Sequence, residues 1–149
     1  MSEPVEADFA IIKVQTAEGP PAVFTQLCGI ENVTRQNAAA GNDRYRRDCT
    51  KMGRPAVRKN RITGKSQTIS GSGAMNIPDF ARFETLLGVK ENYEIEFRQN
   101  DDTDAGKLLG TYAGVYVLMS DNAGADVNGD STGDITLNND GPWTWTPAP

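Results

Sequence analysis

Apolar and polar residues alternate in short segments along most of the chain, which is the pattern of β-strands with one buried face. In residues 93–98, Tyr93, Ile95 and Phe97 alternate with charged residues, which predicts an antiparallel strand with one solvated face. Residues 108–119 are apolar on both faces and predict a central strand of the sheet. Shorter strands are predicted at residues 9–14, 22–28, 30–36, 65–74 and 134–137.

One segment has the period of a helix instead. Phe80, Phe83 and Leu87 are spaced three and four residues apart, and Leu86 widens this apolar stripe. Gly88 follows directly and is expected to end the helix in the left-handed conformation. The stripe predicts a core helix that packs against the sheet and favours this role over a ligand pocket.

Residues 37–64 contain almost no apolar periodicity and predict a long polar loop between two strands. All elements together predict one mainly β (α+β) domain over residues 1–149, an antiparallel β-sandwich or barrel with one flanking helix. Residues 1–8 are expected to form an N-terminal arm, and residues 142–149 a short C-terminal tail. We expect residues 42–61 of the loop to be flexible in the free molecule, because they are charged and lack apolar periodicity.

Charge adds to this picture because it is distributed unevenly along the chain. The net charge is −5. Residues 42–65 carry nine basic and two acidic side chains, a net charge of +7, whereas residues 100–149 carry one basic and eight acidic side chains, a net charge of −7. This asymmetry predicts either an anionic partner or association between unlike surfaces of two copies, and a solvated basic loop is the third interpretation. The basic side chains expected at such a contact are Arg44, Arg46, Arg47, Lys51, Arg54, Arg58, Lys59 and Arg61.

The composition excludes several classes of chemistry. The chain has no histidine, which excludes His-based triads, His general bases and His metal ligands. Cys28 and Cys49 cannot complete a thiolate zinc site within one chain, and both are expected to stay reduced in a cytoplasm. No basic-then-apolar leader and no apolar run of about 20 residues is present, so neither secretion nor membrane insertion is expected. We therefore expect no catalytic residue, cofactor or metal, and an enzyme that uses Glu94 and Glu96 is the least favoured class.

Residues 126–137 resemble a calcium loop of the EF-hand or dockerin type. The oxygen ligands at positions one, three, five and nine would be Asp126, Asn128, Asp130 and Asp134. However, Ser131 stands where a glycine is needed for the sharp turn, and Leu137 where a bidentate glutamate belongs. An Asp- and Asn-rich hairpin loop is therefore the favoured interpretation, and a calcium-binding β-module the alternative.

The basic segment Arg44–Lys65 has a second possible use. It would bind the phosphates of a nucleic acid, with Tyr45 available for stacking on a base. The segment lacks repeated aromatic residues and belongs to a chain with a pI of about 4.7. A small nucleic-acid-binding β-domain is therefore the main alternative function.

The order of features over residues 9–145 resembles the major tail-tube proteins of bacteriophages with long, non-contractile tails. The segments that carry the resemblance are LCGIENVTRQN (27–37), a long polar loop, SQTISGSG (66–73) before a helix, YEIEFRQ (93–99) and residues 110–142. The resemblance rests on the order of the elements, because no residue of this family has a catalytic duty.

The resemblance implies a β-sandwich or barrel with one flanking helix, a fold shared with the tubes of contractile tails and of type VI secretion. It also implies that six copies form a ring and that rings stack into a hollow tube, which surrounds a tape-measure protein and later conducts genomic DNA without specific binding. Tail-tip and head–tail connector proteins are the further implied partners, and the virion, assembled in the bacterial host cytoplasm, is the implied location. The loop of residues 37–64 would reach toward the neighbouring ring and become ordered there.

Overall fold

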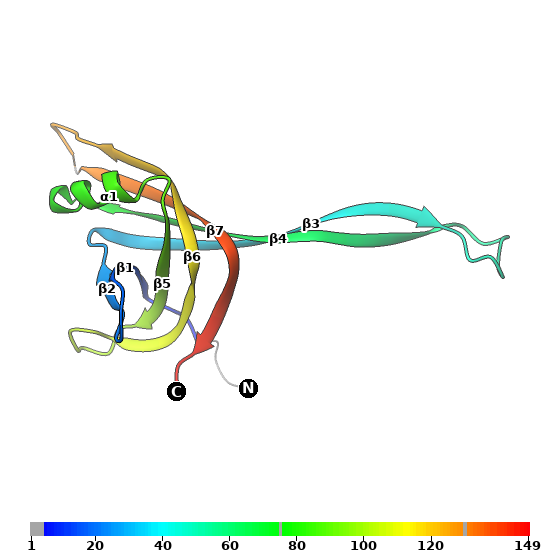
Figure 1. Cartoon of the computed structure of the whole chain (residues 1–149), viewed down its shortest axis with the longest axis horizontal. Helices are drawn as coiled ribbons and strands as arrows, with labels where there is room; N and C mark the ends of the chain where they lie inside the picture. Colours follow the sequence, from blue (N-terminus) through cyan, green and yellow to red (C-terminus); the bar gives the residue numbers. More distant parts are fainter. Residues whose placement is uncertain (1–4, 75, 130) are drawn as a thin grey trace.

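The computed structural model describes residues 5–74, 76–129 and 131–149. One antiparallel sheet of seven strands, in the order β2-β1-β5-β6-β7-β4-β3, makes up most of the molecule (Figure 1). This architecture confirms the predicted mainly β fold class with one short helix. The strands are β1 (Phe9–Ala17), β2 (Val23–Gln26), β3 (Ile30–Arg46), β4 (Val57–Ala74), β5 (Lys90–Gln99), β6 (Lys107–Gly124) and β7 (Thr132–Pro147).

The sheet curls so that one of its faces encloses the core. Alternation along β1 buries Ile12 and Val14, and alternation along β5 buries Tyr93 and Ile95, as the apolar pattern of both segments predicts. The curl brings β1 close to β4 at Gly71, where a Cβ atom would lie 3.2 Å from Ile12. The buried apolar side chains that pack together are Ile12, Val14, Leu27, Ile69, Phe83, Leu86, Tyr93, Ile95, Tyr116, Leu118, Ile135 and Leu137.

The helical segment consists of a 3-10 turn, η1 (Ile77–Asp79), followed by α1 (Phe80–Leu86). Phe83 and Leu86 are buried against the sheet, and Phe80 packs on the edge of the core. Leu87 is 49% exposed instead of buried, because the helix ends at Leu86 and the backbone of Leu87 is extended (φ −60°, ψ 120°). Gly88 has the expected left-handed conformation, with φ +75°. Phe80 and Phe83 therefore contact the core as predicted. The core position predicted for Leu87 is taken by Leu86.

Residues 37–64 are not a loop. Strands β3 and β4 pair from Ile30 opposite Gly73 to Arg46 opposite Val57, with register shifts only at residues 30–32 and 40–41, and residues 47–56 connect them. Figure 1 shows the outer part of this ladder extending far from the rest of the molecule. We call residues 38–66 the hairpin arm and the remainder the body. The arm shows no apolar periodicity because both of its faces are exposed, and backbone pairing does not require a buried face.

The C-terminal strand is also longer than predicted. Residues 132–138 of β7 lie between β4 and β6, whereas residues 143–147 pair with β6 alone. The two parts are separated by an irregularity at residues 140–142, where Gly141 has φ +109°. The Asp-Gly-Pro sequence there looked like the end of the strand, and residues 142–147 were therefore wrongly expected to form a tail. Of the predicted N-terminal arm, residues 1–4 lie outside the described residues, and the Asp8 N–H donates to the carbonyl oxygen of Arg98 (2.9 Å).

Candidate assembly surfaces

The hairpin arm separates its charges between two faces. In an antiparallel ladder, residues opposite each other point to the same side, and successive residues alternate between sides. Three successive register pairs on one side are Asn42 with Arg61, Arg44 with Lys59, and Arg46 with Val57. This side carries four of the eight predicted basic side chains and no carboxylate. We call it the cationic face; its members are Arg44, Arg46, Lys59 and Arg61.

The opposite side of the hairpin arm has a mixed character. Tyr45 lies there opposite Arg58, next to Asp43 opposite Asn60. Arg58 Nη1 lies 3.9 Å from Asp43 Oδ2, and both side chains are more than half exposed, so this ion pair is weak. Tyr45, the stacking residue predicted for nucleic acid, therefore points away from the cationic face. The arm does not combine base stacking and dense phosphate contacts on one surface.

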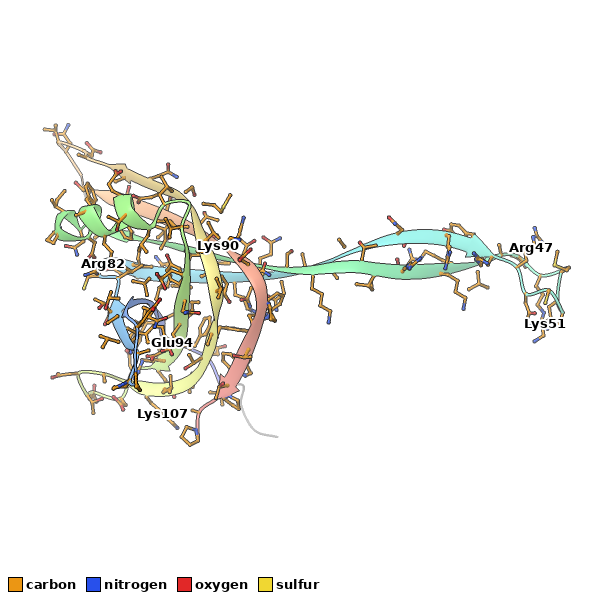
Figure 2. All side chains as sticks on the ribbon, in the orientation of Figure 1. Arg47, Lys51, Arg82, Lys90, Glu94 and Lys107 are labelled. Atoms are coloured by element: carbon orange, nitrogen blue, oxygen red, sulfur yellow. The ribbon has the colours of Figure 1, made fainter. Side chains whose placement is uncertain are left out.

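In the tip of the hairpin arm, residues 47–56, one basic side chain forms hydrogen bonds within the tip itself. Arg47 donates from Nη1 to the carbonyl oxygens of Met52 (3.0 Å) and Arg54 (3.1 Å) and so closes the turn. Figure 2 shows Arg47 and Lys51 at the far end of the arm, remote from the body. The eight predicted basic residues therefore do not act as one group, because Arg47 and Arg58 already have partners in their own chain.

The body presents three free strand edges, and one of them is the body part of β3, which pairs with β4 alone within the described residues. Strand β2 pairs with β1 alone, and residues 143–147 of β7 pair with β6 alone, within the part of the chain that the structure describes. The edges of β2 and of residues 143–147 lie on opposite sides of the subset β2-β1-β5-β6-β7. A free edge offers unpaired N–H and C=O groups, which an additional strand readily satisfies.

An aromatic cluster fixes the free part of β7 on the sheet. Trp145 lies opposite Tyr112 of β6, with ring centroids 4.6 Å apart, and Phe97 of β5 lies 6.1 Å from Tyr112. A Cβ atom at Gly110 would collide with the Trp145 ring, so glycine is required beneath it. The guanidinium of Arg35 lies 5.7 Å above the Tyr112 ring. The free strand edge at residues 143–147 is therefore held in place by packing of the Trp145 side chain.

A groove of about 860 Å³ lies at the end of the body where β3 begins and β4 ends. Most of its side chains are small or neutral, and its charged members are Glu31 and Asp134. Asn122 donates from Nδ2 to Asp134 Oδ1 (2.8 Å). We call this hollow the acidic groove; the polar side chains that line it are Glu31, Asn32, Ser72, Asn122, Ser131, Thr132 and Asp134.

More carboxylates stand beside the acidic groove. Burial raises the pKa of Asp121 above its ordinary value, and the neighbouring carboxylates of Glu84 and Asp134 raise this pKa further. None of Glu31, Glu84, Asp121 and Asp134 forms an ion pair within the described residues. This end of the body therefore carries negative charge that its own chain does not compensate.

Comparison with known proteins gives a structural answer. Neither a protein-family model nor a curated protein matches the sequence. The tail of an empty gene transfer agent (GTA) particle with C6 symmetry matches with a TM-score of 0.60 and 16% identity, over 93% of this chain and 96% of that one. The SPP1 tail tube matches with a TM-score of 0.63 and 11% identity, over 97% and 80%. The PVC sheath-tube complex of an extracellular contractile injection system matches with a TM-score of 0.61 and 15% identity, over 97% of this chain and 93% of that one.

The chain has the tail-tube fold. The resemblance seen in the sequence is thereby confirmed at the level of the fold. Identities of 11–16% establish nothing finer than the fold, so assembly and cargo are matters for proposal.

Within the tail-tube fold, the acidic pair Glu94 and Glu96 does not form a glycosidase site. Glu96 is only 7% exposed and lies 3.0 Å from Lys13 Nζ and 2.9 Å from Arg98 Nε. Burial raises the pKa of Glu96, but the hydrogen bonds from Arg98 and Lys13 outweigh burial and hold this pKa below its ordinary value. A carboxylate engaged in this way links β1 to β5 and is a poor proton donor at neutral pH.

The remaining candidate sites are arranged as follows. Asp130, the third ligand of the suggested calcium loop, lies outside the described residues. Elsewhere in the described ranges, no group of three or more acidic or cysteine side chains is close enough to hold a metal ion. Asp126 Oδ1 instead accepts a hydrogen bond from the backbone N–H of Asn128 (3.0 Å), as in an ordinary Asx turn.

Cys28 and Cys49 are exposed free thiols. In the described residues, no helix has the length and hydropathy needed to span a membrane.

Sequence reasoning missed the acidic groove. Glu31 and Asp134 are 103 positions apart in the sequence, and only the pairing of β3 with β4 and of β4 with β7 brings them together. Sequence reasoning also treated the basic residues of the arm as one group. In the β3–β4 ladder, successive residues alternate between two faces, so the basic residues are divided between them. Predicting this division would have required recognising that residues 37–46 form a strand.

Proposed function

We propose that this protein is the repeating structural subunit of a tail tube, in which copies form a ring and rings stack into a hollow conduit. The observation that carries the proposal is a pair of free edges, β2 and residues 143–147 of β7, on opposite sides of the subset β2-β1-β5-β6-β7. An edge left open on each side of every copy invites a head-to-tail contact, and a head-to-tail contact that closes forms a ring. The gene transfer agent tail has C6 symmetry, and on this basis we propose six copies per ring.

The ring contact places β2 of one copy beside residues 143–147 of β7 in the next. Each contact satisfies two free edges at once, and a closed ring leaves none of them exposed. The aromatic cluster on Tyr112 and Trp145 supports this assignment because it holds one partner strand ready for pairing. The role is structural and requires neither catalytic residue nor cofactor.

The tube would conduct genomic DNA and surround a tape-measure protein during assembly, with tail-tip and connector proteins at its ends. A net charge of −5 per copy suits a conduit that must not adhere to phosphates. The virion, assembled in the bacterial host cytoplasm, is the corresponding location. A secretion tube with the same fold would have the same wall and a different cargo.

Negative-stain microscopy of the purified protein tests the proposal. We expect annular particles with sixfold class averages, together with tubes at higher protein concentration. Monodisperse monomers that shift a DNA fragment on a native gel would instead support the alternative function, a nucleic-acid-binding domain that uses residues 44–65. Monomers that neither assemble nor bind DNA would contradict both functions.

A further inference from the structure

The inference concerns the basic residues of the hairpin arm, which are not equivalent. The four side chains of the cationic face are exposed and have no acidic neighbour across the ladder. Arg58, by contrast, faces Asp43 on the opposite side, and Arg47 is bound to carbonyl oxygens of the tip. Within the described residues, no member of the cationic face forms an ion pair. One face of the arm therefore has charge available for a partner.

The acidic groove has the complementary properties. It is open, its side chains are mostly small, and its two carboxylates, those of Glu31 and Asp134, are exposed and have no cationic partner in the described chain. Small side chains allow the backbone ribbon of a partner to come close. The carboxylates of Glu84 and Asp121 strengthen the negative potential at the same end of the body.

The two complementary surfaces cannot meet within one copy. Glu31 and Arg46 lie at opposite ends of the same strand, β3, so about 50 Å of extended chain separates them at about 3.3 Å per residue. Figure 1 shows the body end of β3 and the tip of the hairpin arm on opposite sides of the molecule. The partner of the cationic face must therefore be another molecule. Unlike surfaces at opposite ends of one chain produce a contact that repeats from copy to copy.

We propose that the cationic face of the hairpin arm binds in the acidic groove of a second copy of this chain, and that this contact joins one ring to the next. The inference rests on the proposed self-assembly into stacked rings. Arg44 and Lys59, opposite each other in the ladder, face Glu31 and Asp134 of the second copy. The mixed face, with Tyr45 and the Asp43–Arg58 pair, remains turned to solvent.

A charge-reversal pair separates this contact from a general effect of charge. The test variant is Arg44→Glu with Lys59→Glu, on the cationic face. The control is Arg54→Glu with Arg58→Glu, at the tip and on the mixed face, which changes the net charge by the same amount. All four side chains are exposed, and unchanged circular dichroism is expected for both variants. We expect the test variant to form rings but to need at least about tenfold more protein for tube growth, because each ring interface repeats the lost contact in every copy.

The reciprocal variant makes the assignment specific. Glu31→Arg with Asp134→Arg alone should also block tube growth, and combined with Arg44→Glu and Lys59→Glu in one chain it should restore tubes, because the charges are exchanged. Tube length and the number of free rings are counted by negative-stain microscopy, at low and raised salt.

The outcomes are distinct. Rings without tubes in the test variant, normal tubes in the control and tubes restored in the combined variant support the contact. Tubes of normal length from the test variant would overturn it while leaving the proposed function intact. Loss of rings together with tubes would overturn its place between rings. Unchanged tubes with a lost DNA gel shift would assign the cationic face to nucleic acid. A wild-type protein that forms neither rings nor tubes would contradict the proposed function itself.

Discussion

The strands β3 and β4 belong to two different environments along their length. In the body, alternate residues of β4 such as Gln67 and Ile69 are fully buried. In the hairpin arm, the same two strands continue with nearly every side chain exposed. The backbone pairing is the same in both parts, so hydrogen bonding alone does not distinguish them. The comparison shows that burial stabilises the body, whereas the arm has little besides its ladder.

This difference has consequences for stability. A two-stranded hairpin alone in water is marginally stable, because it lacks a buried face. The arm therefore gains most of its order from whatever it contacts, whereas the body is stable through its own core. A partner that binds the arm does not have to disrupt packed side chains there.

The largest effect is expected from matched truncations of an apolar side chain in each region. Phe83→Ala removes a buried ring from the core and should lower the free energy of unfolding by about 3–5 kcal/mol. Ile62→Ala in the hairpin arm, where the side chain is 56% exposed, should change it by less than about 0.5 kcal/mol. Thermal melts of both variants measure the difference. Equal melting temperatures for Phe83→Ala and the wild type would show that the core is assigned wrongly.

A smaller effect is expected where the hairpin arm leaves the body. The Tyr116 hydroxyl donates to Gln67 Oε1 in the core, and burial raises the pKa of Tyr116 to about 12, so the hydroxyl stays protonated. Tyr116→Phe leaves Gln67 Oε1 buried without its donor and should cost about 1–3 kcal/mol. Tyr45→Phe, the matched change in the arm, should cost almost nothing, because that side chain is 69% exposed.

Denaturant titrations compare the two tyrosine variants. Equal unfolding midpoints would show that the buried hydrogen bond does not stabilise the root of the arm. The Tyr93 hydroxyl is also buried and has no partner within the described residues. Tyr93→Phe is therefore a useful third variant, with an expected cost well below that of Tyr116→Phe.

The third comparison concerns ion pairs and pH. Hydrogen bonds from Arg98 and Lys13 lower the pKa of Glu96 in the folded state below its ordinary value of 4.5. The ionised carboxylate therefore stabilises the fold above about pH 4.5, and this stability is lost as the pH falls through the lower folded-state pKa. Glu96→Gln should flatten the acid side of the stability profile. Asp43→Asn in the exposed pair of the arm should leave the profile unchanged.

Unfolding midpoints measured between pH 3 and pH 7 compare these two variants with the wild type. An acid profile of Glu96→Gln identical to that of the wild type would contradict a stabilising role for the Lys13–Glu96–Arg98 group. An equally large change for Asp43→Asn would contradict the distinction between the two regions.

The sequence predicted the body far better than the arm, for a physical reason. Alternation in residues 93–98 and the stripe of Phe80 and Phe83 exist because one side of each element is buried, and burial selects apolar residues. The hairpin arm has no buried side, so its residues reveal charge but not conformation. Residues 142–147 were missed for a related reason, because an Asp-Gly-Pro turn signal lies within an irregular part of β7 and not at its end.

The candidate assembly surfaces were predictable only in part. The excess of positive charge in residues 42–65 was visible, but its division into two faces requires the register of β3 and β4. Arg58 and Lys59 are adjacent in sequence, yet they lie on opposite faces of the ladder. The acidic groove depends on contacts between distant strands, which no local pattern contains.

Amide hydrogen exchange in the free subunit and in assembled tubes tests whether a second copy orders the hairpin arm. We expect slow exchange in the body in both states, because strands such as β5 and β6 enclose the core. For residues 38–66 we expect fast exchange in the free subunit and strong protection in tubes, where a second copy orders the hairpin arm. Tryptic cleavage after the arginines of the arm should follow the same pattern. An arm that exchanges at the same rate in free subunits and in tubes would contradict the claim that another copy binds it.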